Sequence, residues 1–195
     1  EQALAPGDTL VCDASLASGW GGVYFEQRQP GRQVLFPRGQ AGLGYALPAA
    51  IGAATATKGT ATKGTARART IVLTGDGALG YAVGELATIT ELGLPITVVV
   101  LNNRSLGWIR WYQRITFGRG WEDDDFADVA YGDVARGFGM RGVRVTDPAE
   151  LGAALTAALR SDRPALVDVV TEAWETPIGG HRDAIAQGAT AGYGG

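Results

Sequence analysis

Cysteine and histidine each occur only once in this sequence of 195 residues. Cys12 has no second cysteine to pair with, so an intrachain disulfide is excluded and a reducing cytoplasm is the expected location. It lies in the apolar run "TLVCD", where an inert thiol in the protein core is expected. No apolar run approaches the roughly 20 residues of a membrane-spanning helix, and no signal peptide is recognisable. Membrane attachment is therefore not expected.

An excess of positive charge is also missing, because 17 lysines and arginines stand against 20 aspartates and glutamates. The chain as a whole has no basic field that would attract nucleic acid. Residues 104–121 do interleave aromatic side chains with arginines, a pattern found in proteins that bind single strands. The acidic run "EDDD" at 122–125 follows at once and cancels the local charge. Nucleic-acid binding is therefore not expected, and a subunit interface is an alternative role for this segment.

Strand-like and helix-like patterns alternate along the chain. Short runs rich in β-branched residues predict strands at Thr9–Asp13, Val34–Phe36, Thr70–Thr74, Ile96–Leu101, Gly142–Val145 and Ala165–Val170. Apolar residues three and four apart predict helices at Tyr45–Ala56, Ala78–Leu92, Leu106–Arg114, Tyr131–Phe138 and Pro148–Arg160. The last has Asp147 as its expected N-cap and Pro148 at its first position. The alternation predicts an α/β fold with a doubly wound, mainly parallel sheet and helices on both faces.

The chain length suits one domain, which we expect to span residues 1–180. Residues 55–66 contain a short tandem repeat rich in Thr, Gly and Lys, which predicts a surface loop. Residues 181–195 are expected to form a flexible tail. Because the chain begins with Glu1 rather than methionine, a processed product or a piece of a longer protein is expected.

The segment "GDG" follows one predicted strand and opens a helix. Gly75 and Gly77 allow unusual backbone angles and close approach of a ligand to the main chain. A helix N-terminus favours a phosphate group, but Asp76 would repel that phosphate unless a cation stood between them. Mg²⁺ prefers such hard oxygen ligands, commonly one carboxylate together with phosphate oxygens and water. The segment thus points to a metal-bridged phosphate.

The pair Asn102-Asn103 ends the next predicted strand, with 24 residues between Gly77 and Asn102. The carboxyl ends of neighbouring parallel strands form the ligand-binding edge of an open α/β sheet, so Asn103 could add an amide oxygen to the metal. Taken separately, Asp-Gly is a common turn pair and Asn-Asn can cap a helix. A dinucleotide-binding turn is the rival hypothesis, but no acidic ribose ligand follows a second strand.

These motifs resemble those of a known family. "GDG", 24 residues and then "NN" is similar to the thiamine-diphosphate signature of acetolactate synthase-like enzymes, a family of 2-oxoacid decarboxylases and carboligases. The resemblance covers most of the chain, including "DASLASGW" (Asp13–Trp20), "RGQAGLGYALPAAIGA" (Arg38–Ala53) and "GELAT" (Gly84–Thr88). It implies the carboxyl-terminal, diphosphate-binding domain of a three-domain enzyme. The segment "NNRSLGWIRWYQR" further resembles glyoxylate carboligase and its relatives.

The resemblance implies roles for individual residues. It implies that Mg²⁺ is bound by the side chains of Asp76 and Asn103 and by the main-chain carbonyl of Ser105. It implies that the diphosphate contacts Gly75, Gly77, Ala78, Leu106 and Gly107. Leu43 would prop the cofactor in a bent shape, and the carbonyl of Ala41 would accept a hydrogen bond from its pyrimidine amino group. Ala78, Leu16 and Ala17 depart from the polar residues that the family often has near the diphosphate.

The resemblance also implies a reaction and partners. The cofactors would be thiamine diphosphate and Mg²⁺, the substrate a 2-oxoacid, and the outcome carboligation or decarboxylation. The usual catalytic glutamate belongs to a pyrimidine-binding domain that these residues lack, so no catalytic side chain is expected here. We expect that domain to come from the same or another polypeptide, in a homodimer or tetramer, and the isolated chain to be inactive. Residues 104–121 would then form a lid or channel wall. Two alternatives stay open: a non-catalytic domain of the same fold, and a nicotinamide-dependent oxidoreductase.

Overall fold

A computed structural model of the chain describes residues 4, 7–27, 33–57, 68–119, 125–173 and 176–177. Within these residues, six strands form one sheet in the order β2-β1-β3-β4-β6-β5, and every neighbouring pair is parallel. The strands are β1 (Thr9–Cys12), β2 (Val34–Leu35), β3 (Thr70–Gly75), β4 (Ile96–Asn102), β5 (Arg141–Val145) and β6 (Ala165–Val170). The predicted doubly wound parallel sheet is confirmed.

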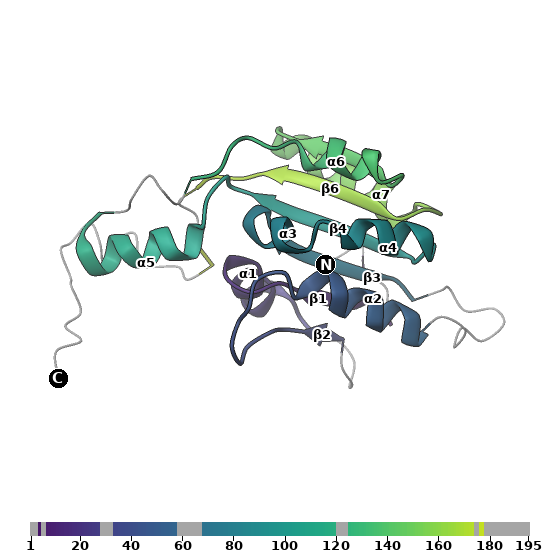
Figure 1. Ribbon diagram of the computed structural model, residues 1–195, viewed down its shortest axis with the longest axis horizontal. Coiled ribbons are helices and arrows are strands. Elements are labelled where there is room, and N and C mark those ends of the chain that lie inside the picture. The colour runs from purple at the N-terminus through teal and green to yellow at the C-terminus, as the bar shows by residue number, and fades with distance from the viewer. Residues whose placement is uncertain are drawn as a thin grey trace.

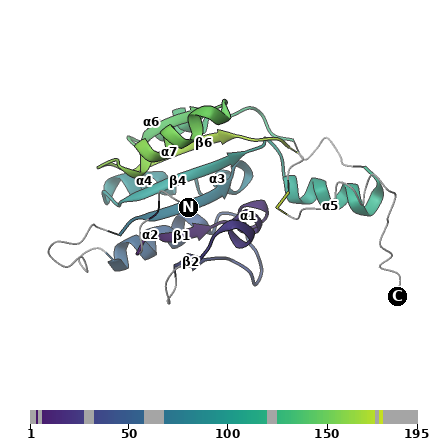
Figure 2. The ribbon, with the colours of Figure 1, turned by 180° about the vertical axis from the view of Figure 1, so that it is seen from behind.

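Helices cover both faces of the sheet (Figures 1 and 2). One face carries α2 (Ala46–Thr57), α3 (Asp76–Ala82), α4 (Glu85–Glu91) and α6 (Tyr131–Gly137). The other carries α1 (Leu16–Tyr24) and α7 (Leu151–Leu159), which follows the 3-10 turn η2 (Pro148–Glu150). The last helix, α5 (Gly107–Phe117), follows β4 and extends away from the sheet (Figure 1). No described helix is both long and apolar enough to cross a membrane.

Successive side chains of the central strands point to opposite faces of the sheet, so the core forms two layers. Val11, Val72 and Val98 face the layer under α2, α3, α4 and α6. Their neighbours Leu10 and Ile71 face the opposite layer. Strands that bury both faces read as continuous apolar runs, which is why the sequence shows no alternation of polar and apolar residues there.

Some helix boundaries differ from those predicted. The helix predicted at Ala78–Leu92 is two segments, α3 and α4, separated at residues 83–84. The helix predicted from Pro148 begins as the turn η2, although Asp147 caps it as expected by accepting a hydrogen bond from the main-chain N–H of Ala149 at 2.9 Å. Residues 58–66 of the tandem repeat, and the tail from 181, lie outside the described residues.

Helix α1 was not predicted, because its sequence "LASGWGGVY" contains three glycines. Packing explains two of them, and a Cβ atom at Gly19 would lie 2.5 Å from Cγ of Pro177. A Cβ atom at Gly21 would lie 2.4 Å from Sγ of Cys12, so only glycine allows α1 to approach β1 this closely. Cys12 is fully buried, and burial raises the pKa of its thiol to about 12. It is the inert core thiol that the sequence predicted.

Candidate functional site

The polar residues singled out in the sequence gather at the carboxyl edge of the sheet. Gly75 in β3 lies opposite Leu101 in β4, so Asp76 and Asn103 leave neighbouring strands at the same edge. A cavity of about 910 Å³ opens there. It is lined by most of the predicted site residues: Leu43, Gly75, Asp76, Gly77, Ala78, Asn103, Ser105, Leu106 and Gly107.

Asp76 is the first residue of α3 and is almost completely buried. Its Oδ1 atom accepts a hydrogen bond from the main-chain N–H of Gly77 at 2.8 Å. Its Oδ2 atom is buried and has no hydrogen-bond partner among the described residues. Burial raises the pKa of this carboxyl to about 6, although main-chain N–H groups, those of Gly77 and Arg104 among them, oppose the rise. A buried carboxylate oxygen without a partner is unfavourable unless a cation binds it.

The two consecutive asparagines have different surroundings. Asn102 is buried, and its side-chain amide donates to Oδ1 of Asp168 at 2.9 Å and to the carbonyl of Val129 at 3.0 Å. Asn103 lines the cavity, and its Oδ1 atom accepts a hydrogen bond from the main-chain N–H of Ser105 at 3.3 Å. Asn102 thus joins β4 to β6 and to the segment just before α6, whereas the side-chain amide of Asn103 faces the cavity.

Ser105 adds a second unpartnered oxygen to the cavity wall. Its Oγ atom is buried and has no hydrogen-bond partner among the described residues. The resemblance to the family implied a role only for the main-chain carbonyl of Ser105. Its hydroxyl carried no signal in the sequence, because serine after an asparagine pair is equally typical of a turn.

Three glycines around the cavity have different spatial requirements. A Cβ atom at Gly77 would lie 2.8 Å from the ring of Phe126, and one at Gly107 would lie 2.5 Å from Nδ2 of Asn103. Both glycines therefore allow close packing within the protein. Gly75 is different, since a Cβ atom there would meet no described atom within 4 Å and its φ of −89° suits any residue. The open space beside its main chain faces the cavity, as expected where a ligand approaches the backbone.

Backbone strain is concentrated in the loops at this edge. Among the described residues other than glycine, Ser15, Ala41 and Arg104 have positive φ angles, of 67°, 54° and 56°. The three follow β1, β2 and β4 respectively. Left-handed backbone at such residues costs on the order of 1–3 kcal/mol each and clusters at ligand sites.

Ala41 and Leu43 lie in the loop between β2 and α2. Leu43 lines the cavity, whereas Ala41 is exposed and is not among the residues that line it. The buried carboxylate of Asp13 holds this loop: Oδ1 accepts from the main-chain N–H of Gly44 and Oδ2 from that of Ala46, each at 3.0 Å. Sequence reasoning missed Asp13 as a positioning residue, although it follows a strand in the same way as Asp76.

The remaining wall is mainly apolar and comes from α1, with residues such as Leu16, Ala17 and Trp20. Thr171 and Glu172, directly after β6, also line the cavity. Leu16 and Ala17, the two departures from the family pattern in this wall, thus face the cavity with apolar side chains. The polar groups for a metal come from the residues around Asp76 and Asn103.

This donor set fits Mg²⁺ and a diphosphate. Asp76, Asn103 and Ser105 offer oxygen atoms, the hard ligands that Mg²⁺ prefers, with room for ligand oxygens or water. No described group of three or more His, Cys, Asp or Glu residues could hold a metal by itself. A single carboxylate with neutral oxygens suits a metal whose other ligands come from a phosphate. Such a site defines a metal-dependent diphosphate-binding domain of the α/β class.

The family model for "Thiamine pyrophosphate enzyme, C-terminal TPP binding domain" matches residues 13–169, and the chain belongs to this family. The resemblance seen in the sequence is confirmed. Thiamine diphosphate (thiamine pyrophosphate) and Mg²⁺ are the cofactors of this family. The unpartnered Oδ2 of Asp76 and the open face of Gly75 are consistent with both.

Similar proteins include decarboxylases and carboligases. The chain is 31% identical to benzoylformate decarboxylase of Pseudomonas aeruginosa, over 89% of this chain and 31% of that protein. It is 30% identical to a probable acetolactate synthase large subunit of Methanocaldococcus jannaschii, over 91% of this chain and 29% of that protein. A solved structure, the thiamine diphosphate-dependent 4-hydroxybenzoylformate decarboxylase of Rhodococcus jostii RHA1, matches with a TM-score of 0.73 and 26% identity, over 89% of this chain and 31% of that one. The chain thus spans about a third of the length of these relatives.

Proposed function

We propose that this chain is the diphosphate- and Mg²⁺-binding domain of an enzyme that acts on 2-oxoacids. One observation carries the proposal. The buried Oδ2 atom of Asp76 has no hydrogen-bond partner among the described residues, and Asp76 shares a cavity with Asn103, Ser105 and the open main chain of Gly75. A cation bound to a diphosphate would satisfy this oxygen and neutralise the carboxylate.

The residues divide into metal ligands and diphosphate contacts. Asp76 and Asn103 hold Mg²⁺ through side-chain oxygens, and Ser105 holds it through its main-chain carbonyl. The diphosphate lies against the first turns of α3 and α5, where unpaired main-chain N–H groups favour anions. The contacts there come from Gly75, Gly77, Ala78, Leu106 and Gly107. Leu43 would support the cofactor from the β2–α2 loop, and the carbonyl of Ala41 would accept a hydrogen bond from its pyrimidine amino group.

When bound, thiamine diphosphate supplies the electron sink for cleavage of the bond between a 2-oxoacid's carboxylate and carbonyl carbons. The chain's own residues fix the cofactor's charged end and exclude water from it, because α1 and Leu43 give the cavity apolar walls. No residue of this chain is assigned a proton-transfer role. Carboligation and simple decarboxylation both fit this arrangement, as the names of the similar proteins illustrate.

The proposal includes a partner for the other end of the cofactor. A pyrimidine-binding domain outside these residues supplies the catalytic glutamate, and the active site forms between subunits of a homodimer or tetramer. Residues 1–180 are proposed as one domain and 181–195 as its tail. The cytoplasmic location stays a prediction from the single cysteine.

Calorimetric titration tests the proposal. The complete protein that carries these residues is titrated with thiamine diphosphate, first with Mg²⁺ and then with EDTA. We expect binding that requires Mg²⁺ and is lost in Asp76→Asn. Binding of NAD without Mg²⁺ would instead favour the oxidoreductase alternative. Binding of thiamine diphosphate without turnover of any 2-oxoacid would favour a non-catalytic domain.

A further inference from the structure

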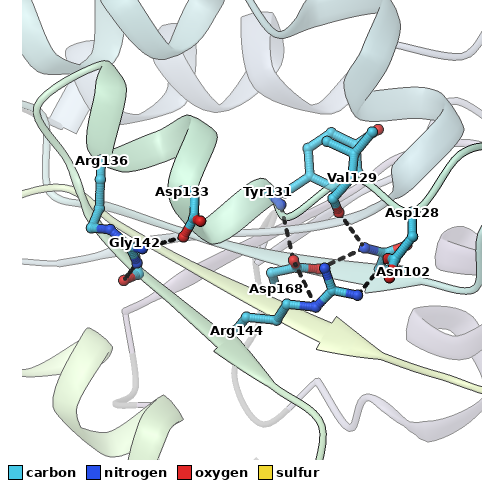
Figure 3. A network of polar contacts seen from close by, with 9 residues as sticks. All are labelled: Asn102, Asp128, Val129, Tyr131, Asp133, Arg136, Gly142, Arg144 and Asp168. Carbon is cyan, nitrogen blue, oxygen red and sulfur yellow. Dashed lines mark hydrogen bonds and ion pairs between the residues drawn. The ribbon is translucent and has the colours of Figure 1, made fainter.

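A buried carboxylate lies at the centre of a polar network behind the candidate metal site. Asp168 is fully buried in the middle of β6, within the otherwise apolar run "ALVDVV". Its Oδ1 atom accepts from the side chain of Asn102, and its Oδ2 atom accepts from the main-chain N–H of Tyr131 at 2.9 Å. Figure 3 shows these groups converging on Asp168, with the side chain of Arg144 beside it. Nε of Arg144 lies 3.8 Å from Oδ2 of Asp168, and its guanidinium also pairs with Asp128.

The network reaches the candidate site by two routes. On one side it fixes Asn102, and Asn103 follows directly in the chain. On the other side it fixes the start of α6, where the hydroxyl of Tyr131 donates to the main-chain carbonyl of Asp76 at 3.2 Å. Burial and the charges of Asp76 and Asp168 raise the pKa of Tyr131, so this hydroxyl keeps its proton and donates.

Tyr131 contacts Asp76 from outside the lining of the main cavity. It lines a second, smaller cavity of about 420 Å³, which also contacts Asp76, and is not among the residues that line the main one. It is therefore placed to orient the main chain of Asp76 without being part of the wall of the main cavity. A buried carboxylate with several hydrogen bonds is suited to fixing one arrangement of the elements around it.

We propose that Tyr131 and Asp168 are positioning residues of the metal site, setting the first turn of α3 and the end of β4 relative to each other. Tyr131 acts on the main chain of Asp76, and Asp168 acts through Asn102 and Tyr131. This inference rests on the proposed Mg²⁺–diphosphate function. It adds that the metal site depends on residues of β6 and α6, neither of which supplies a ligand.

Tyr131→Phe tests the inference in the complete protein, because it removes only the hydroxyl. The dissociation constant for Mg²⁺ is measured by calorimetry at saturating thiamine diphosphate, and the thermal midpoint is measured without cofactor. We expect Mg²⁺ affinity to fall about three- to tenfold, as for loss of one net hydrogen bond. The control Tyr81→Phe alters an exposed tyrosine, 77% accessible, and should leave the affinity unchanged.

A second variant separates positioning from general loosening of the fold. Leu159→Ala removes a buried side chain of the other core layer, so it should lower the thermal midpoint and leave Mg²⁺ affinity unchanged. Unchanged Mg²⁺ affinity in Tyr131→Phe would overturn the inference, as would an equal loss of affinity in Leu159→Ala. If the parent protein binds thiamine diphosphate without any need for Mg²⁺, the proposed function itself fails.

Discussion

At the scale of single residues, the buried carboxylate of Asp76 lowers the stability of the metal-free protein, although it is the proposed ligand of Mg²⁺. Its pKa is raised from 3.8 to about 6 in the folded, metal-free protein. The folded state therefore holds the proton more tightly than the unfolded state, and the free energy of unfolding should fall as pH rises from about 4 to about 6. About two pKa units correspond to a loss on the order of 3 kcal/mol. Urea unfolding of the metal-free protein at several pH values would measure it.

Asp76→Asn should remove this penalty and the function together. Asparagine keeps an oxygen for the N–H of Gly77 but carries no charge. At pH 7.5 without metal, we expect the variant to be more stable than the parent by about 1–3 kcal/mol, since no buried charge remains. Its Mg²⁺-dependent cofactor binding should be lost. A variant less stable than the parent at this pH would contradict the assignment of a buried, unpartnered carboxylate.

The pH dependence of metal binding follows from the same group. Below a pH of about 6 the carboxyl of Asp76 is protonated and must lose its proton to bind Mg²⁺. Mg²⁺ affinity should fall about tenfold for each further unit of pH. Competition titrations between pH 4.5 and 8 would show this change of slope in a plot of Mg²⁺ affinity against pH. A flat profile across pH 6 would exclude Asp76 as a ligand.

Gly75 and Gly77 form a matched pair for testing where the ligand lies. The Cβ atom of Gly75→Ala would meet no described atom within 4 Å, so stability should change little. Thiamine diphosphate binding should weaken by tenfold or more, because the methyl group would occupy the space beside the main chain. Gly77→Ala would place a Cβ atom 2.8 Å from Phe126, so it should lower stability by about 1–3 kcal/mol as well. Thermal melts and calorimetry on both variants distinguish the effects. Normal cofactor binding by Gly75→Ala would place the diphosphate elsewhere.

At the scale of elements, α1 forms through tertiary contact rather than helix propensity. Gly21→Ala would bring a Cβ atom to 2.4 Å from Sγ of the buried Cys12, so stability should fall by about 1–3 kcal/mol. Its neighbour Gly22 is exposed with no described atom within 4 Å of a Cβ, so Gly22→Ala should stabilise α1 by about 0.5–1 kcal/mol. Chemical denaturation measures both. Equal changes in stability for the two variants would show that α1 does not pack closely against β1.

The same contrast explains which elements could be predicted from the sequence. Strands such as β3 and β4 are apolar on both faces and end in turn residues, so local patterns were sufficient. Helix α1 contains three glycines, and its close approach to Cys12 is visible only in three dimensions. The break between α3 and α4 has no proline to mark it.

At the scale of the whole molecule, those site residues could be predicted from the sequence that directly follow a strand. Asp76 and Asn103 stand out because polar residues interrupt apolar runs at the ligand-binding edge. Asp13, Asp168 and Tyr131 act by hydrogen bonds to distant main-chain or side-chain groups, such as the 31-residue separation between Asp13 and Gly44. No local pattern encodes such pairs, so their positioning roles could not be read from the sequence.

In the proposed function, the chain supplies one end of a cofactor site. Its cavity is lined by Asp76, Asn103 and Ser105 together with apolar residues of α1, and no residue there is assigned to proton transfer. The chain spans about a third of the length of its similar proteins. We therefore propose the reaction for an assembly larger than these residues, in which this domain holds the charged end of the cofactor.

The most direct test of this account is the titration of the complete protein with thiamine diphosphate in Mg²⁺ and in EDTA, with Asp76→Asn beside it. The account predicts binding in Mg²⁺ that disappears in EDTA and in the variant, while the variant remains folded. Binding of equal strength in EDTA, or in Asp76→Asn, would contradict the central claim that Asp76 joins the diphosphate to the protein through a metal ion.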